Sequence, residues 1–135
     1  MTAPSSDPRC NQPFLEGPLA GHSRFYQRLH RRYADDLVLL PPGCPVLATM
    51  EQAYDALCAR GCDTGTALRM LRQLVMERLI QLDCEAQAPL ADITRAVTEL
   101  AELALDRACA QARRELDERH GAPCGPQGQP VQLWI

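Results

Sequence analysis

The sequence predicts an all-α fold of about four helices in a bundle, followed by a single C-terminal β-strand. Three observations lead to this prediction. Four stretches carry apolar residues at the i, i+3 and i+4 spacing of an amphipathic helix, and prolines and glycines separate them. Residues 131–135 form a short apolar run behind a turn-rich connector, which is typical of a buried strand. Because a lone strand leaves its backbone hydrogen-bonding groups unpaired, this run predicts a sheet whose other strands lie outside this sequence.

The composition is that of a globular protein and argues against several classes of partner. The chain has 135 residues, of which 46% are hydrophobic and 23% charged, so one domain with a core is expected. The net charge of −3 argues against nucleic acid or an anionic membrane as an obligatory partner. No run approaches the ~20 apolar residues of a membrane span, and the first ten residues lack the apolar segment of a secretory leader. We therefore expect a cytoplasmic protein.

Most of the seven cysteines are interpreted as small core residues kept reduced in that compartment. Cys58 and Cys62 lie four residues apart, but no nearby Cys/His pair completes a zinc site. The sequence therefore assigns no metal ligand.

The N-terminal part predicts a flexible tail and then a first helix. Residues 1–22 contain four prolines and no sustained apolar period. Ser23 is the expected cap of a helix that runs to about Val38, with Leu29 and Leu37 on its apolar face. His30 falls among arginines on the other face, where solvated charge is a more usual explanation than a site for an acidic partner. The Pro-Pro-Gly run at 41–43 ends the helix.

Two further helices are expected between Thr49 and Cys84. Thr49 begins the second helix, because Thr49 and Gln52 have the spacing of a capping box, and Gly61 ends it. Asp63 or Thr64 caps the third helix, which runs to about Cys84. Its core stripe is Leu68, Leu71, Leu74 or Val75, Leu79 and Leu82. Off this stripe lie Arg69, Arg72, Glu77 and Arg78, which we interpret as surface charge rather than a phosphate-binding row.

The fourth predicted helix is the longest, from Pro89 to His120, and Gly121 ends it. His120 is interpreted as a residue of the last turn rather than as a general acid or base. A connector with several prolines and glycines follows at 122–130, and then the apolar run. The inward stripe of this helix is expected to be Ile93, Val97, Leu100, Ala104, Ala108, Ala112 and Leu116, with Leu103 and Cys109 near its margins.

No motif for chemistry is present in the sequence. It contains no Gly-rich phosphate loop, no nucleophile elbow and no paired carboxylates with a supporting histidine. We therefore assign no catalytic, cofactor-binding or metal-binding residue.

An ordered series of segments nevertheless resembles a known family. It comprises Leu-Arg-Met-Leu-Arg-Gln-Leu-Val-Met-Glu-Arg-Leu at 68–79, Pro-Leu-Ala-Asp-Ile-Thr at 89–94 and Leu-Ala-Glu at 100–102. Ala-Arg-Arg-Glu-Leu at 112–116, His-Gly-Ala-Pro at 120–123 and Gly-Gln-Pro-Val-Gln-Leu-Trp-Ile at 128–135 complete it. Together they resemble the N-terminal helical region of the bacterial glutamine synthetase adenylyltransferase, the bifunctional adenylyl-transferring and adenylyl-removing enzyme. The resemblance covers residues 23 to 135 and is densest from Leu68 onward.

The resemblance implies a scaffold that precedes a catalytic domain. In that family, the strand matching 131–135 leads into a Gly-rich, Lys-containing turn and an Asp-x-Asp pair that holds magnesium for nucleotidyl transfer. This sequence stops before those motifs, so none of the family's catalytic residues is carried over and the chain alone should be inactive. ATP and magnesium are implied for the full-length family member, and no cofactor for this part. Implied partners are glutamine synthetase and the nitrogen-signalling PII protein.

The expected organisation follows from both lines of reasoning. Residues 1–22 form the tail, 23–121 the helical region, and 122–135 the connector and first strand of a truncated nucleotidyltransferase domain. The alternative is a free-standing helical protein–protein interaction module whose last strand adds to the sheet edge of a partner.

Overall fold

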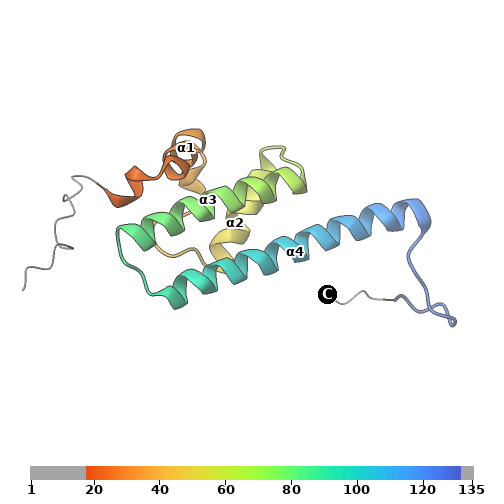
Figure 1. Cartoon of the computed structure of the whole chain (residues 1–135). Helices are drawn as coiled ribbons and strands as arrows, with labels where there is room; N and C mark the ends of the chain where they lie inside the picture. The colour runs from red at the N-terminus through yellow and green to blue at the C-terminus, as the bar shows by residue number, and fades with distance from the viewer. Residues whose placement is uncertain (1–17, 132–135) are drawn as a thin grey trace, which may run out of the picture.

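Four α-helices make up most of the protein in the computed structural model, which describes residues 18–131 (Figure 1). In chain order the elements are the 3₁₀ turn η2 (Leu19–His22), α1 (Arg24–Arg32), the 3₁₀ turn η3 (Leu37–Leu39), α2 (Leu47–Ala59), α3 (Thr64–Cys84) and α4 (Leu90–His120). Between residues 18 and 131 there is no β-strand, only an isolated bridge between Cys124 and Pro130. The all-α class and the four helices are therefore confirmed.

The remaining sequence predictions at the two ends fall mostly outside the described part. Val131 is not assigned to a strand, and residues 132–135 of the predicted strand lie outside the described residues. The same holds for residues 1–17 of the predicted tail. Within that tail, Leu19–His22 forms η2, and Ala20 is buried, so these residues are ordered into the fold rather than left without structure.

The core is centred on α3, which contacts each of the other three α-helices. Leu71, Leu74 and Val75 on α3 are completely buried, as the apolar stripe of the sequence predicts. The facing side chains are Met50, Ala53, Tyr54 and Leu57 from α2 and Ala96, Leu100 and Leu103 from α4. Leu68 and Leu82 at the ends of the α3 stripe are only partly buried against this core.

The caps of α1 and α3 are those expected from the sequence. Ser23 Oγ accepts a hydrogen bond from the backbone N–H of Tyr26 at 3.3 Å. Asp63 Oδ1 accepts one from the N–H of Thr66 at 3.0 Å, and its other carboxylate oxygen accepts from the Thr66 hydroxyl at 2.6 Å. These side chains satisfy N–H groups that have no partner within the first turn.

The first helix is shorter than predicted. It ends at Arg32, and the chain turns through Tyr33–Asp36 before the 3₁₀ turn η3. The prediction that it runs to Val38 is wrong, because the Ala-Asp-Asp run at 34–36 favours a turn over a continued helix. Leu37 still reaches the core, as its spacing suggested, and Tyr33 packs against the core as well.

The second helix begins two residues earlier than predicted, at Leu47. Thr49 is therefore not its cap. Instead, the Thr49 hydroxyl oxygen accepts a hydrogen bond from the N–H of Val46 at 3.1 Å and donates one to the carbonyl of Val46 at 2.8 Å. The residue that precedes this helix is apolar, so the polar partner comes from inside the first turn.

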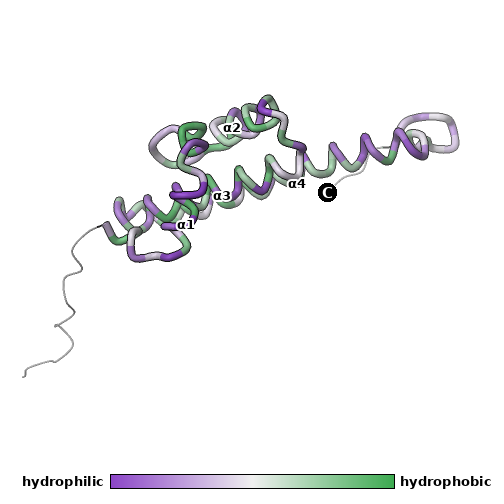
Figure 2. The backbone as a smooth tube through the Cα atoms, turned by 90° about the horizontal axis from the view of Figure 1, so that it is seen from above, coloured by the Kyte–Doolittle hydropathy of each residue, from purple (hydrophilic) through white to green (hydrophobic). Residues whose placement is uncertain are grey.

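Only the first half of α4 belongs to the bundle, as Figures 1 and 2 show. Its buried residues are Ala96, Leu100 and Leu103, whereas Leu105 and Leu116 are more than half exposed. Thr64 Oγ1 at the start of α3 donates a hydrogen bond to Gln111 Oε1 at 3.5 Å, and α4 continues beyond this contact to His120.

The predicted inward stripe of α4 is therefore wrong in its outer part, where Ala108, Ala112 and Leu116 are exposed. Val97, in its inner part, is also 45% exposed. The physical reason for the outer error is helical drift: each step of four residues overshoots one turn by about 40°. Four such steps from Leu100 rotate the stripe by about 160°, so it leaves the bundle and emerges on the opposite face of α4.

Candidate docking groove on the long helix

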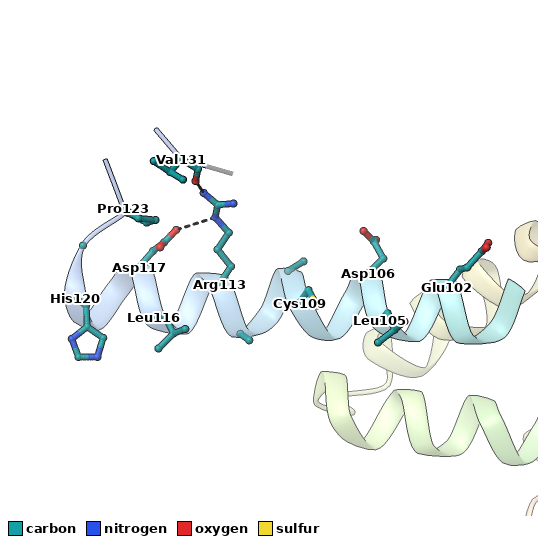
Figure 3. Close-up of a pocket in the computed structure, with 13 residues that line it drawn as sticks. Glu102, Leu105, Asp106, Cys109, Arg113, Leu116, Asp117, His120, Pro123 and Val131 are labelled. Atoms are coloured by element: carbon teal, nitrogen blue, oxygen red, sulfur yellow. Dashed lines mark hydrogen bonds and ion pairs between the residues drawn. The ribbon is translucent and has the colours of Figure 1, made fainter. Parts of the chain in front are cut away.

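The outer half of α4 and the connector after it enclose an open, mostly apolar groove of about 1010 Å³ (Figure 3). At 100° per residue, most of the α4 residues that line it, such as Leu105, Cys109 and Leu116, point away from the bundle face formed by Ala96, Leu100 and Leu103. The groove thus lies on the side of α4 that no helix of the bundle covers. Its apolar lining consists of Leu105, Cys109, Ala110, Ala112, Leu116, Pro123 and Val131.

The connector is held against α4 by a small set of hydrogen bonds. Arg113 Nη2 donates to the carbonyl of Val131 at 2.6 Å, and the Arg113 Nε lies 3.7 Å from Asp117 Oδ2. Within the connector, the N–H of Val131 donates to the carbonyl of Pro123 at 3.0 Å, and the N–H of Gly125 to that of Gln129 at 2.8 Å. The chain therefore doubles back through residues 123–131 and returns along the helix it has just left.

Two glycines make this return possible. Gly121, with φ of 80°, ends α4, and its N–H donates to the carbonyl of Asp117 at 2.9 Å. Gly128, with φ of 76°, lies at the tip of the connector. Both are in the left-handed region, which residues with a Cβ rarely adopt. The prediction that Gly121 ends the helix is confirmed.

The rim of the groove is acidic. Glu102, Asp106 and Asp117 line it, and Arg113 is already hydrogen-bonded to the connector. Carboxylates around an apolar floor disfavour phosphate and other anions, whereas they suit an apolar peptide segment surrounded by polar contacts. His120 is exposed at the outer end of the groove, in the last turn of α4 as predicted.

A second polar feature lies between α1 and α3. The polar residues Gln73, Glu77, Gln81 and Glu85 repeat every four positions on α3, and we call them the α3 polar row. Glu77 is only 1% exposed, and its Oε1 lies 2.8 Å from His30 Nδ1. The interpretation of Glu77 as surface charge is therefore wrong. His30 is exposed, as predicted, but it also pairs with Glu77.

Two other members of the α3 polar row, Gln81 and Glu85, also reach the N-terminal elements. Gln81 Nε2 donates to the Tyr26 hydroxyl at 2.8 Å, and Glu85 Oε1 accepts from the N–H of Ala20 at 2.6 Å. Burial, the largest cause, raises the pKa of the Tyr26 phenol, and the carboxylates of Glu77 and Glu85 raise it further. The regular spacing of Gln and Glu was the available signal, but it does not say which face α1 will cover.

The arginines of α3 do not form one row. Arg69 and Arg72 are exposed, beside a small hollow that Arg32 and Tyr33 also line. Arg78 is partly buried, and its Nη2 donates to the carbonyl of Leu40 at 3.0 Å. The prediction that Arg78 is surface charge is therefore wrong, because its guanidinium ties the segment after η3 to α3.

The cysteines differ in burial, and the pair Cys58 and Cys62 lies at the core. Cys58 and Cys62 are partly buried against the core, in keeping with their interpretation as small core residues. Cys44 and Cys124 are exposed, so that interpretation does not extend to them. Among residues 18–131 no three His, Cys, Asp or Glu side chains come together as a metal site would require. In the same part of the chain, none of the helices combines the length and the apolar character that a membrane crossing needs.

Comparisons with known proteins identify relatives of one kind. The family model described as glutamate-ammonia ligase adenylyltransferase matches residues 19–135. The bifunctional glutamine synthetase adenylyltransferase/adenylyl-removing enzyme of Burkholderia mallei is 32% identical over 94 residues, which is 65% of this chain and 10% of that protein. The enzyme of the same description from Chromobacterium violaceum is 43% identical over 70 residues, or 51% of this chain and 8% of that protein.

A third such enzyme, from Thioalkalivibrio sulfidiphilus, is 38% identical over 68 residues, or 50% of this chain and 7% of that protein. The chain thus spans about a tenth of the length of the curated relatives it matches. No solved structure matches it.

Proposed function

The chain belongs to the glutamate-ammonia ligase adenylyltransferase family, and from this premise we propose that it is the helical scaffold of such an enzyme. The whole enzyme would attach AMP to a tyrosine of glutamine synthetase and remove it again, which regulates nitrogen assimilation. In this proposal residues 23–121 are the helical region that precedes the adenylyl-removing domain. Residues 122–135 are the connector and first strand of that nucleotidyltransferase domain, residues 1–22 precede the helical region, and the chain alone is inactive.

The observation that carries the proposal is the outer half of α4. It projects beyond the bundle and carries an apolar groove with Leu105 and Leu116 more than half exposed. Keeping such side chains in water costs roughly 25 cal/mol for each Å² that a neighbouring domain could cover. The connector then leads the chain back along α4 beside Arg113, which is where a following domain would begin.

Chemistry and regulation are proposed for the whole protein. Adenylyl transfer needs ATP, and metal ions such as magnesium neutralise the phosphates and align the attacking group. We propose that ATP and magnesium bind elsewhere in the enzyme, and that glutamine synthetase and the PII protein are its partners. We also propose that it acts in the cytoplasm.

A chimera tests the scaffold role. Residues 19–135 would replace the matching segment of the Burkholderia mallei enzyme, and removal of AMP from adenylylated glutamine synthetase would be measured. The chimera should retain the removal activity. Leu105→Asp in the chimera should reduce it, because a carboxylate is costly to bury in an apolar contact. Val38→Asp is the matched control, since Val38 is 76% exposed on η3, away from the groove, and should change nothing.

Thermal melting of each chimera establishes that it is folded. A folded chimera that lacks the activity of its parent would contradict the scaffold role. An intact activity in the Leu105→Asp chimera would show that the groove contacts no other domain. Transfer or removal of AMP by the 135-residue chain alone would contradict the proposal that it is inactive.

A further inference from the structure

A group of exposed arginines covers α1 and the first half of α3, and we call it the arginine band. Its members are Arg24, Arg28, Arg31 and Arg32 on α1 and Arg69 and Arg72 on α3. Neither α1 nor residues 64–76 of α3 contain an Asp or a Glu. The ion pairs found among residues 18–131 all join other side chains, so no carboxylate in this part of the chain neutralises the band. A protein with a net charge of −3 therefore carries one strongly positive face.

Three members of the band line a hollow between the end of α1 and α3. The hollow has a volume of about 610 Å³, and Arg32, Arg69 and Arg72 contribute its positive charge. Tyr33 and Met70 also line it, and both are partly buried against the core. The hollow thus combines apolar surface with three exposed guanidinium groups.

Two of these guanidinium groups are positioned by neighbouring side chains. Arg69 Nη2 donates a hydrogen bond to Thr66 Oγ1 at 3.0 Å, and Arg32 Cζ lies 5.6 Å from the centroid of the Tyr33 ring. The carboxylate of Asp63, at the start of α3, already accepts two hydrogen bonds from Thr66, at 3.0 and 2.6 Å. A guanidinium carries five N–H donors and binds a carboxylate through two of them. Donors are therefore left over for an anion from outside the chain.

The band extends well beyond the hollow. Arg28 lies one helical turn before Arg32, and Arg24 and Arg31 are on the face of α1 opposite the buried Leu29. The seven residues from Arg24 to Arg31 rise about 10 Å along the helix. A ligand that used the whole band would thus need several negative charges in a row.

These features favour an acidic peptide over other anions. A phosphate ion would leave the apolar side chains of Tyr33 and Met70 without a partner. Single-stranded nucleic acid stacks its bases on free aromatic faces, whereas Arg32 lies over the partly buried ring of Tyr33. A helix that binds a membrane inserts apolar side chains beside its charges, and the outward face of α1, at Arg24, Gln27, Arg28 and Arg31, offers none.

We infer that the arginine band binds an acidic segment of a partner protein. Carboxylates of the segment pair with Arg32, Arg69 and Arg72, and an apolar side chain beside them packs on Tyr33 and Met70. Further carboxylates lie along the outward face of α1. The band shares no residue with the groove on α4, so the inference goes beyond the proposed function and does not depend on it.

Fluorescence anisotropy with a labelled peptide tests the inference on the whole chain. The probe is Glu-Glu-Leu-Glu-Glu, and the control probe has Gln in place of each Glu. The acidic probe should bind at least about tenfold more tightly than the control probe, because carboxylates accept charge-assisted hydrogen bonds from arginine. Added salt should weaken this binding, because it screens exposed charges.

Matched variants separate the band from the total charge of the protein. Arg69→Gln/Arg72→Gln should weaken binding of the acidic probe at least about tenfold, since it removes two charged donors from the hollow. Arg114→Gln/Arg119→Gln removes the same charge from exposed sites on outer α4 and should weaken binding less than about twofold. Arg69→Lys/Arg72→Lys keeps the charge but loses the paired donors, so its affinity should fall between those of the unmodified chain and the Gln variant. Circular dichroism shows that each variant is helical.

Several results would overturn the inference. The unmodified chain could fail to bind the acidic probe, or bind both probes equally. The two Gln double variants could lose affinity equally, and net charge alone would then explain the binding. Inorganic phosphate, a thymidine oligonucleotide and phosphatidylserine vesicles are each added at the same concentration of negative charge as the probe. None should displace it, and displacement by one of them would assign the band to that class of ligand instead.

Discussion

The buried carboxyl group of Glu77 gives the sharpest test of how α1 is attached. Glu77 is 1% exposed, and its Oε1 lies 2.8 Å from His30 Nδ1, while its Oε2 has no hydrogen-bond partner among the described residues. The His30 side chain is 54% exposed, and its ring stacks on that of Tyr26 with centroids 5.5 Å apart. The two partners are thus unequal: water reaches His30 but not Glu77.

This inequality predicts unequal costs of substitution. His30→Phe retains a ring against Tyr26 but removes the nitrogen, which leaves the Glu77 carboxyl without a partner. The loss should be about 1–3 kcal/mol of unfolding free energy. His30→Ala also removes the stacking, which adds about 0.5–1.5 kcal/mol. Glu77→Leu removes the buried polar group while keeping similar volume, so its cost should stay within about 1 kcal/mol or become a gain.

Urea denaturation followed by far-ultraviolet circular dichroism measures these free energies by linear extrapolation. The double variant His30→Phe/Glu77→Leu should be nearly as stable as Glu77→Leu, because the histidine matters only while the carboxyl is buried. The reasoning is refuted if His30→Phe is as stable as the unmodified chain. It is also refuted if Glu77→Leu loses more stability than His30→Phe.

Three further predictions follow from the described residues. Leu71→Ala, at a completely buried site, should cost about 3 kcal/mol, whereas Leu116→Ala, at a site 55% exposed, should cost less than about 0.5 kcal/mol in urea denaturation. Hydrogen bonds from Thr66 hold the pKa of the Asp63 carboxyl below its usual 3.8. The stabilisation of the fold by the ionised Asp63 is therefore fully present above pH 3.8 and is lost as the pH falls through the lowered pKa. In acid melts, Asp63→Asn should remove this pH dependence. Burial raises the pKa of Tyr26 above 10.0. The contribution of the neutral phenol to the free energy of unfolding is therefore fully present below pH 10.0 and is lost as the pH rises through the raised pKa. Alkaline melts should show a smaller loss for Tyr26→Phe.

Local rules were sufficient for much of the fold. Asp63 and Gly121 mark helix ends because a side-chain acceptor and a left-handed residue satisfy backbone groups close in sequence. The stripe through Leu71 and Leu79 is buried because it belongs to the central helix, which contacts each of the other three α-helices. Such features need no knowledge of where distant segments lie.

The features that could not be predicted depend on tertiary placement. Glu77 has the spacing of a surface residue, and only the position of α1 over α3 buries it. The outer stripe of α4 is apolar in the sequence whether it faces the bundle or the opposite side. The groove further requires that Arg113 bind the carbonyl of Val131, a contact between residues 18 positions apart across a turn. The sequence does not show the partner in either contact.

The outer half of α4 is hard to explain from this chain's bundle alone. Beyond Leu103 none of its side chains is buried, and the local pairs Gln111–Glu115 and Arg113–Asp117 are worth only about 0.2–0.5 kcal/mol each. A helical stretch of this length is marginal in water without tertiary packing. Its exposed leucines add a hydration cost on the same face. An occupant of the groove would remove both costs together, because it would bury Leu105 and Leu116 and pack against the turns that carry them. The surface that the proposed scaffold presents to a catalytic domain is therefore also the surface that the helix needs to have covered.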